Sequence, residues 1–321
     1  MIVRTTDYHT AGEPFRIVTG GVPALEGATI LDKRRFALSE LDGVRRLLVQ
    51  EPRGHADMYG CFVVEPNDAG ADLGVVFFHN AGYSTACGHG TIALVTWALD
   101  EGLVARREGE NRVVVDVPSG RVETWARVEG GRVRSVRFRN VPSFVWGTGV
   151  VAGPHRVDLA FGGAFYASLP ERVEPAELPR LIALGREVKR ELEAAHDIVH
   201  PLEPELRDVY GVIFWQDEGG TPLTQRNVTV FADGEVDRSP CGSGTSARLA
   251  LLEASGRLRR GEELRHRSIV GTEFRGRVVG EGDVAGTPAV LTEVEGAAYR
   301  TGRAAFELDP GDPLGDGFLL R

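Results

Sequence analysis

The sequence predicts an α+β protein of two similar halves, in each of which a curved β-sheet or barrel surrounds one central helix. The first observation is that the pattern C-G-x-G-T-x-A-x-L begins at Cys87 and again at Cys241, about half the chain later. The second is that the helix expected after the first copy, 91–100, is apolar nearly all round and has strand-like segments on both sides in sequence. A helix without a polar face must be enclosed, and a sheet wrapped around it encloses it.

The first half contains strand patterns, turns and one further helix. Helical periodicity over 31–49 predicts an amphipathic helix with a solvated charged face. Cys61 begins a strand and is interpreted as a core thiol, because no repeat partner exists for it. A continuous apolar strand, 73–79, leads into the first cysteine motif. Three short strands with partial alternation then follow, at 112–117, 122–128 and 133–138.

The second half repeats the order of strand, loop, cysteine and helix. Segment 159–167 predicts one strand with a bulge at its glycine pair. Segment 174–193 predicts a helix broken near Gly185. Strands at 209–215 and 227–232 precede the second cysteine motif, and further strands and turns complete the chain.

Each cysteine motif places a thiol and two glycines before a helix of about ten residues, with a glycine stop at Gly102 or Gly256. Glycines there leave the first helical N–H groups uncovered, which makes an anion site. A cysteine at the positive end of the helix dipole is expected to have a lowered pKa. Two such termini facing one another would hold a carboxylate with a sulfur on each side, as a cofactor-independent racemase or epimerase requires. Either copy alone would suit a glycine-rich turn with a small buried cysteine.

Composition limits the classes of function. The hydrophobic content of 42% with 26% charged residues is typical of a soluble globular protein, and the net charge of −9 argues against nucleic acid or an anionic membrane as partner. The N-terminus has no signal-peptide pattern, and three cysteines without framework spacing favour free thiols in a cytoplasmic, reducing compartment. A non-catalytic carboxylate binder, or a redox protein that joins Cys87 and Cys241, remains an alternative.

Segments spread over nearly the whole chain resemble the proline racemase superfamily, which shares the diaminopimelate-epimerase-like fold. They are His9–Pro14, Glu51–Gly54, Met58–Gly60, Asn80–Gly90, Gly162–Tyr166 and Asp237–Thr245. The resemblance implies two pseudo-symmetric halves, with catalysis in the cleft between them and no metal, pyridoxal phosphate or nucleotide. The expected halves are 1–145, completed by the strands at about 300–321, and 146–299. The resemblance also suggests a homodimer.

The same resemblance implies that Cys87 and Cys241 are the two acid–base thiols, one on each side of the substrate Cα. The Cα proton of an amino acid is very weakly acidic. A neutralised carboxylate and a retained ammonium stabilise the carbanion electrostatically. A thiol near neutral pKa can act as either acid or base, as a reversible two-base reaction demands.

The remaining site residues are implied to bind substrate. Backbone N–H groups of four residues would bind the carboxylate: Gly88, His89, Gly242 and Ser243. Asp237 and the His89 side chain would hold the amino group. Tyr59 and Phe231 would line the pocket for the ring, and their aromatic character suits an apolar pyrrolidine.

Proline or a hydroxyproline is the expected substrate. Cysteine at both positions favours inversion at Cα and hence proline racemase-like activity, because many dehydratases of the superfamily have Thr for the second cysteine or Ser for the first. Segments 51–60, 80–83 and 312–320 look most like the trans-3-hydroxy-L-proline dehydratase branch, which is the second reading. 4-Hydroxyproline 2-epimerisation ranks third, because Tyr59 and Phe231 offer no obvious partner for a ring hydroxyl.

Overall fold

The computed structural model describes residues 2–320 and has the α+β composition predicted. Its contacts divide the chain into two compact units. Unit 1 comprises the chain up to Val136 together with the part from Ala297 onward, and unit 2 is Arg137–Gly296. The expected division at 145/146 and 299/300 stays a prediction about domains. No helix among the described residues is long and apolar enough to cross a membrane.

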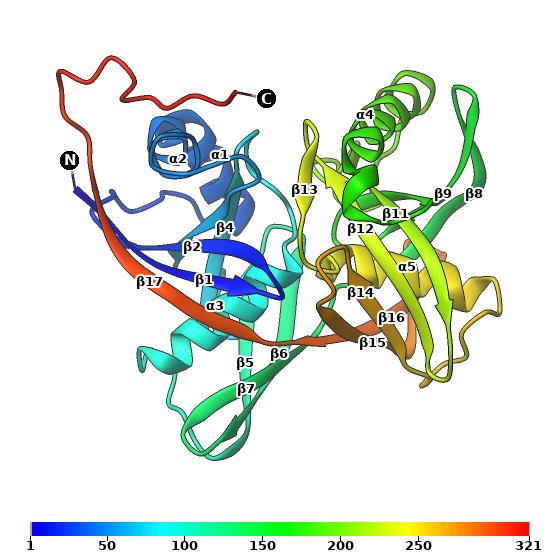
Figure 1. Ribbon diagram of the computed structural model, residues 1–321. Helices are drawn as coiled ribbons and strands as arrows, with labels where there is room; N and C mark the ends of the chain where they lie inside the picture. The colour runs from blue at the N-terminus through cyan, green and yellow to red at the C-terminus, as the bar shows by residue number, and fades with distance from the viewer. Residues whose placement is uncertain (1, 321) are drawn as a thin grey trace. The chain divides into compact units, whose positions relative to one another are not determined.

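Unit 1 is built on strands from both ends of its sequence (Figure 1). They are β1 (Ile2–Thr10), β2 (Glu13–Gly20), β3 (Tyr59–Val64), β4 (Leu73–His79), β5 (Gly109–Val117), β6 (Gly120–Glu129), most of β7 (Arg132–Arg139) and β17 (Ala298–Glu307). Strand β1 pairs antiparallel with both β2 and β17, so the end of the chain returns to its beginning. The pairing continues through β2–β3, β3–β4, β4–β5 and β5–β6.

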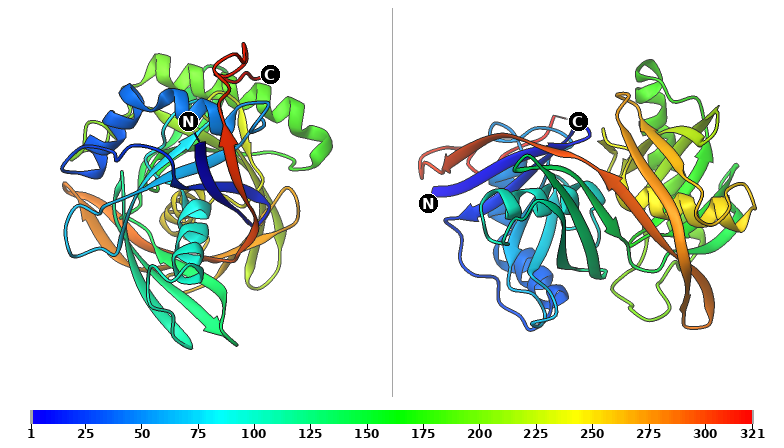
Figure 2. Two further views of the ribbon diagram at one scale, coloured as in Figure 1. Left: turned by 90° about the vertical axis from the view of Figure 1, so that its left-hand side faces the viewer. Right: turned by 90° about the horizontal axis from the view of Figure 1, so that it is seen from below.

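The sheet of unit 1 has one helix on its inner face and two on the other. Helix α3 (Gly88–Asp100) contacts β1, β2, β3, β6 and β17, and every residue before its last is buried. Helices α1 (Ile30–Glu40) and α2 (Asp42–Val49) pack on β4 (Figure 2). Residues of both helices belong to the apolar cluster that is buried there. The prediction of an enclosed central helix is confirmed.

Unit 2 has the same organisation. Its strands are β8 (Phe144–Ala152), β9 (His155–Phe161), β10 (Phe165–Pro170), β11 (Val209–Gly219), β12 (Leu223–Phe231), β13 (Glu235–Asp237), β14 (Leu264–Ser268), β15 (Glu273–Val284) and β16 (Thr287–Gly296). Helix α5 (Gly242–Ala254) contacts β8, β9, β10, β15 and β16 and is buried over its first eleven residues. A short 3₁₀ turn, Pro175–Glu177, precedes α4 (Leu178–Ala195), which packs on β8, β11 and β12 around the main apolar cluster.

Both central helices end as the glycine pattern predicts. Gly102 and Gly256 have φ of +75° and +69°, the left-handed conformation that glycine adopts without strain. The N–H of Leu103 then bonds the carbonyl of Ala98 at 2.9 Å, and Arg257 makes the matching bond in α5. The two helices, both thirteen residues long, therefore end in the same way.

Three predicted elements were wrong in detail. The helix expected over 31–49 is two helices, because Leu41 leaves the helical conformation with φ −119° and ψ 12° between them. Segment 159–167 is not one bulged strand. It is the β9–β10 hairpin, with Phe161 paired to Phe165. Helix α4 runs unbroken through Gly185, where a Cβ would lie 2.9 Å from Val230 of the sheet.

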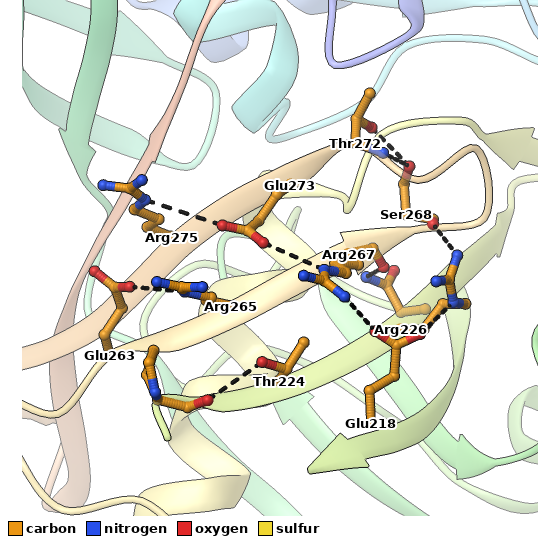
Figure 3. Close-up of polar contacts among 12 residues, drawn as sticks. Glu218, Thr224, Arg226, Glu263, Arg265, Arg267, Ser268, Thr272, Glu273 and Arg275 are labelled. Carbon is orange, nitrogen blue, oxygen red and sulfur yellow. Dashed lines mark hydrogen bonds and ion pairs between the residues drawn. The ribbon is translucent and has the colours of Figure 1, made fainter. Parts of the chain in front are cut away.

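One face of strands β11, β12, β14 and β15 has a row of ion pairs (Figure 3). Glu218 accepts hydrogen bonds from Arg226 at 2.6 Å and from Arg267 at 3.0 Å, and Arg267 also reaches Glu273 at 3.3 Å. Arg265 pairs with Glu263 on the same strand face. Since residues alternate along a strand, the intervening side chains of β14 point to the other face, and they are buried.

Candidate active site

In unit 1, Cys87 is the N-cap residue of α3 and is buried. Its Sγ accepts a hydrogen bond from the Gly90 N–H at 3.2 Å, and its carbonyl accepts one from the Thr91 hydroxyl at 2.8 Å. Position 90 requires glycine, because a Cβ there would lie 2.4 Å from the Phe15 ring and 2.7 Å from the Cys87 sulfur. The motif thus points a backbone donor at the sulfur, which favours negative charge on it.

His89 lies beside this sulfur. Its two ring nitrogens are 3.5 and 3.6 Å from Cys87 Sγ, and its ring packs edge-on against Phe15 and Tyr59. Burial lowers the pKa of His89 to about 3, so the imidazole is neutral at physiological pH. A neutral ring can accept a hydrogen bond from a substrate ammonium without repelling it.

The surroundings of Tyr59 are more polar than expected for a residue that lines an apolar pocket. Its hydroxyl is hydrogen-bonded to the hydroxyl of Ser84, and both residues are buried. Ser84 stands three positions before Cys87, in the loop after β4, and sequence reasoning gave it no role. The Tyr59–Ser84 hydroxyl pair is therefore a polar feature on the same unit as Cys87, and it could bind a ring hydroxyl.

In unit 2, Cys241 is the residue immediately before α5, and its backbone differs from that of Cys87. Its φ is +61° with ψ 105°, whereas Cys87 has φ −154° and ψ 100°. The Cys241 N–H donates to Ser239 Oγ at 3.1 Å, and the Ser239 N–H donates to Asp237 Oδ1 at 2.8 Å. The two copies of the motif therefore have different backbone conformations at their cysteines.

The pKa expectation for Cys241 was wrong. Burial and the nearby Asp237 carboxylate raise the pKa of this thiol to about 12, although hydrogen bonds around the sulfur act in the opposite direction. The helix terminus favours the thiolate, but the loss of water around a thiol that is 5% exposed costs more. Cys241 is thus a neutral thiol, suited to giving a proton. Burial also raises the pKa of Asp237, to about 6.

Tyr166 is a site residue for which the sequence offered no role. The Cys241 thiol donates to its hydroxyl over 3.8 Å, and that hydroxyl lies 2.6 Å from Ser243 Oγ. The Tyr166 ring packs edge-on against Tyr210, which stacks on Phe231. The one available signal was that Tyr166 ends a segment on which the family resemblance rests.

The structure thus assembles the predicted residues within each unit. Unit 1 brings Cys87, Gly88, His89 and Tyr59 together, and unit 2 brings together Cys241, Gly242, Ser243, Asp237 and, through Tyr210, Phe231. Gly88 and Gly242 are the first residues of α3 and α5, where N–H groups have no partner within the helix. Within residues 2–320, no group of three or more His, Cys, Asp or Glu side chains is placed to hold a metal ion.

A family model described as proline racemase matches residues 5–319. The chain belongs to the proline racemase family. It is 44% identical to a trans-3-hydroxy-L-proline dehydratase of Bacillus cereus and 46% identical to a 3-hydroxyproline 2-epimerase of Burkholderia multivorans, over 99% of this chain and 98% of each relative. A hydroxyproline epimerase from Agrobacterium vitis, solved with trans-4-hydroxy-L-proline bound, superposes with a TM-score of 0.92 at 32% identity, covering 99% of this chain and 96% of that one.

Membership in the proline racemase family confirms two sequence predictions. The fold is the α+β fold of the family, because a solved member superposes over nearly its whole length. The chain is an enzyme of the racemase, epimerase and dehydratase group, since its relatives are named for these activities. The roles of Cys87, Cys241 and the substrate-binding residues stay predictions.

Proposed function

We propose that this enzyme removes the Cα proton of trans-3-hydroxy-L-proline and expels the 3-hydroxyl as water. The observation that favours this reaction is the name of the relative from Bacillus cereus, a trans-3-hydroxy-L-proline dehydratase 44% identical over nearly its full length. The epimerase with bound trans-4-hydroxy-L-proline is more distant, at 32% identity. The Tyr59–Ser84 hydroxyl pair supports a ring-hydroxylated substrate over proline, because it supplies partners for that hydroxyl.

In this proposal Cys87 is the base. The Gly90 N–H stabilises negative charge on its sulfur, whereas Cys241, with its raised pKa, holds its proton. The backbone N–H groups of residues 88, 89, 242 and 243, at the starts of α3 and α5, bind the carboxylate. Asp237 as carboxylate and His89 as neutral imidazole hold the substrate amino group. Each of these contacts stabilises the carbanion that forms when the Cα proton leaves.

The stereochemistry of the substrate allows one thiol to complete the dehydration. In trans-3-hydroxy-L-proline the hydroxyl and the Cα hydrogen lie on the same face of the ring. Cys87 as thiolate takes the Cα proton, the electron pair forms the Cα–C3 double bond, and the C3–O bond breaks. The Cys87 thiol then gives its proton to the departing hydroxide, which yields water and restores the thiolate. The enamine product tautomerises to a pyrroline carboxylate.

Epimerisation at C2 is the second candidate reaction, and the presence of Cys241 favours it. The neutral Cys241 thiol could protonate the Cα carbanion with inversion before the hydroxyl leaves. One relative, at 46% identity, is named a 3-hydroxyproline 2-epimerase. Racemisation of unsubstituted proline would use the same two thiols, but it would leave the Tyr59–Ser84 hydroxyl pair without a ring hydroxyl to bind.

The substrate is tested by incubating the reduced enzyme in D₂O with trans-3-hydroxy-L-proline, trans-4-hydroxy-L-proline and L-proline, each followed by NMR. We expect a pyrroline carboxylate from the first, with a much smaller turnover of the other two. Inversion of the first compound without loss of its hydroxyl would establish the epimerase instead. Turnover of L-proline alone would contradict a ring-hydroxylated substrate.

A further inference from the structure

Strand β14 presents a buried histidine to helix α5. Arg265 and Arg267 point to the ion pairs of the outer face (Figure 3), so the alternate residue, His266, faces inward. His266 is fully buried, and its Nδ1 lies 2.8 Å from the hydroxyl of Thr245 in the first turn of α5. The side chain is therefore attached to the start of the helix that follows Cys241.

Thr245 connects His266 to the backbone of Cys241 through a second hydrogen bond. Its hydroxyl donates to the Cys241 carbonyl at 2.7 Å and lies 3.2 Å from that of Pro240. A threonine hydroxyl has one proton, so with that proton on the Cys241 carbonyl it accepts from His266. The ring is then protonated at Nδ1, with Nε2 as an acceptor that has no partner in the described part of the chain. The pKa of His266, lowered to about 3 by burial, agrees with a neutral ring.

The two copies of the motif show what this hydrogen-bond chain adds. Thr91 bonds the Cys87 carbonyl at 2.8 Å, as Thr245 bonds that of Cys241, but no histidine bond to Thr91 is present among residues 2–320. Cys87 has an ordinary extended backbone. Cys241 has φ +61° with ψ 105°, a backbone conformation that residues with a Cβ rarely adopt. Such a conformation persists only when surrounding contacts fix it. The histidine is found at the copy with the strained cysteine.

We propose that His266 is a positioning residue. Through the Thr245 hydroxyl it fixes the Cys241 carbonyl, and it thereby keeps the Cys241 side chain in the position from which it donates its proton. The Cys241 N–H is fixed from the other side by Ser239 Oγ at 3.1 Å, so both peptide groups of this residue are anchored. The inference extends the proposed function, because it rests on Cys241 acting as a proton donor. It assigns a function to a buried polar group that makes no contact with the candidate thiols.

The test uses two variants of the full-length reduced enzyme. His266→Leu fills the space without a donor, and His266→Asn keeps an N–H close to the position of Nδ1. The readout is the iodoacetamide alkylation rate of Cys241 relative to Cys87, measured by peptide mass spectrometry. We expect His266→Leu to raise this ratio about fivefold or more as Cys241 leaves its buried position, and His266→Asn to stay within about twofold of the wild type.

Substitutions of threonine supply the matched control and a second route if His266→Leu does not fold. Thr245→Val should reproduce the shift in the alkylation ratio, Thr245→Ser should restore the wild-type ratio, and Thr91→Val should leave Cys241 unaffected. An unchanged ratio in both His266→Leu and Thr245→Val overturns the proposal, as does an equal rise at both cysteines. The readout needs no turnover, so a shifted ratio in an enzyme inactive on every hydroxyproline would sustain the positioning role and refute the proposed function.

Discussion

Asp237 and Cys241 lie four positions apart before α5, and burial favours the uncharged form of both. The Asp237 carboxylate is 4% exposed and accepts the Ser239 N–H at 2.8 Å. That bond and the nearby charge of Arg238 do not compensate for lost hydration, since the pKa of Asp237 is raised from 3.8 to about 6. A buried carboxylate retained at such a cost is typical of a functional group.

Replacing Asp237 should therefore stabilise the fold while it removes activity. The folded-state pKa lies above the unfolded-state value, so ionisation destabilises the folded protein; the penalty grows between about pH 4 and pH 6 and is constant above. Asp237→Asn should raise the free energy of unfolding at pH 7 by about 3 kcal/mol, an order-of-magnitude value from that shift. Urea unfolding at pH 4 and pH 7 measures it. The exposed Asp316→Asn variant is the control, and a less stable Asp237→Asn protein at pH 7 would contradict the explanation.

In unit 2 the β9–β10 hairpin lies close against the start of α5. A Cβ on Gly162 would lie 2.3 Å from the Ser243 carbonyl oxygen and 2.7 Å from the Ala247 nitrogen, both of which are backbone atoms that cannot rotate away. The Gly162 carbonyl is fixed in turn by Asn140 Nδ2 at 2.7 Å. Glycine at this turn thus determines how deeply the helix N-terminus sits in its sheet.

Gly162→Ala should separate α5 from this hairpin. We expect it to lower the free energy of unfolding by about 2 kcal/mol, as overpacked sites do, and to lower turnover by disturbing the start of α5. Gly43→Ala is the control, because position 43 lies in α2 with no atom within 4 Å of the added Cβ, and alanine favours a helix there by about 1 kcal/mol. Equal stability of the two variants in urea would show that the close contact has no energetic importance.

Some elements could be predicted from sequence because their signals are local. Gly102 and Gly256 marked the ends of α3 and α5, and the continuous apolar run at 73–79 placed β4. The break at Leu41 gave no signal, because α1 and α2 bury the same side and the apolar period continues across it. Gly185 was interpreted as a helix breaker, although close packing on Val230 explains it.

The residues of the candidate site were predictable only where the repeat or the family resemblance reached them, as at Tyr59, Phe231 and Asp237. The motif located Cys87 and Cys241, but Tyr166 and His266 reach Cys241 or its helix from distant positions in the chain. The raised pKa of Cys241 depends on burial, which no short motif encodes. The positive φ of Cys241 could not be predicted either, because the same motif has an extended backbone at Cys87.

At the scale of the whole molecule, the two units share one organisation, each with a buried thirteen-residue helix directly after a cysteine. The surroundings of the two cysteines differ in chemistry. One sulfur accepts a backbone N–H beside a neutral histidine, and the other is a protonated thiol beside a carboxylate and a tyrosine. This difference suits a base and an acid more than two interchangeable thiols.

The most direct test of this division is the reaction of trans-3-hydroxy-L-proline in D₂O with the Cys87→Ala and Cys241→Ala enzymes, followed by NMR. Cys87→Ala should abolish Cα exchange and dehydration together, because the base is gone. Cys241→Ala should keep dehydration within about tenfold of the wild type and lose any inversion at C2. Undiminished dehydration in Cys87→Ala, or its complete loss in Cys241→Ala alone, would contradict the assignment of Cys87 as base and Cys241 as acid.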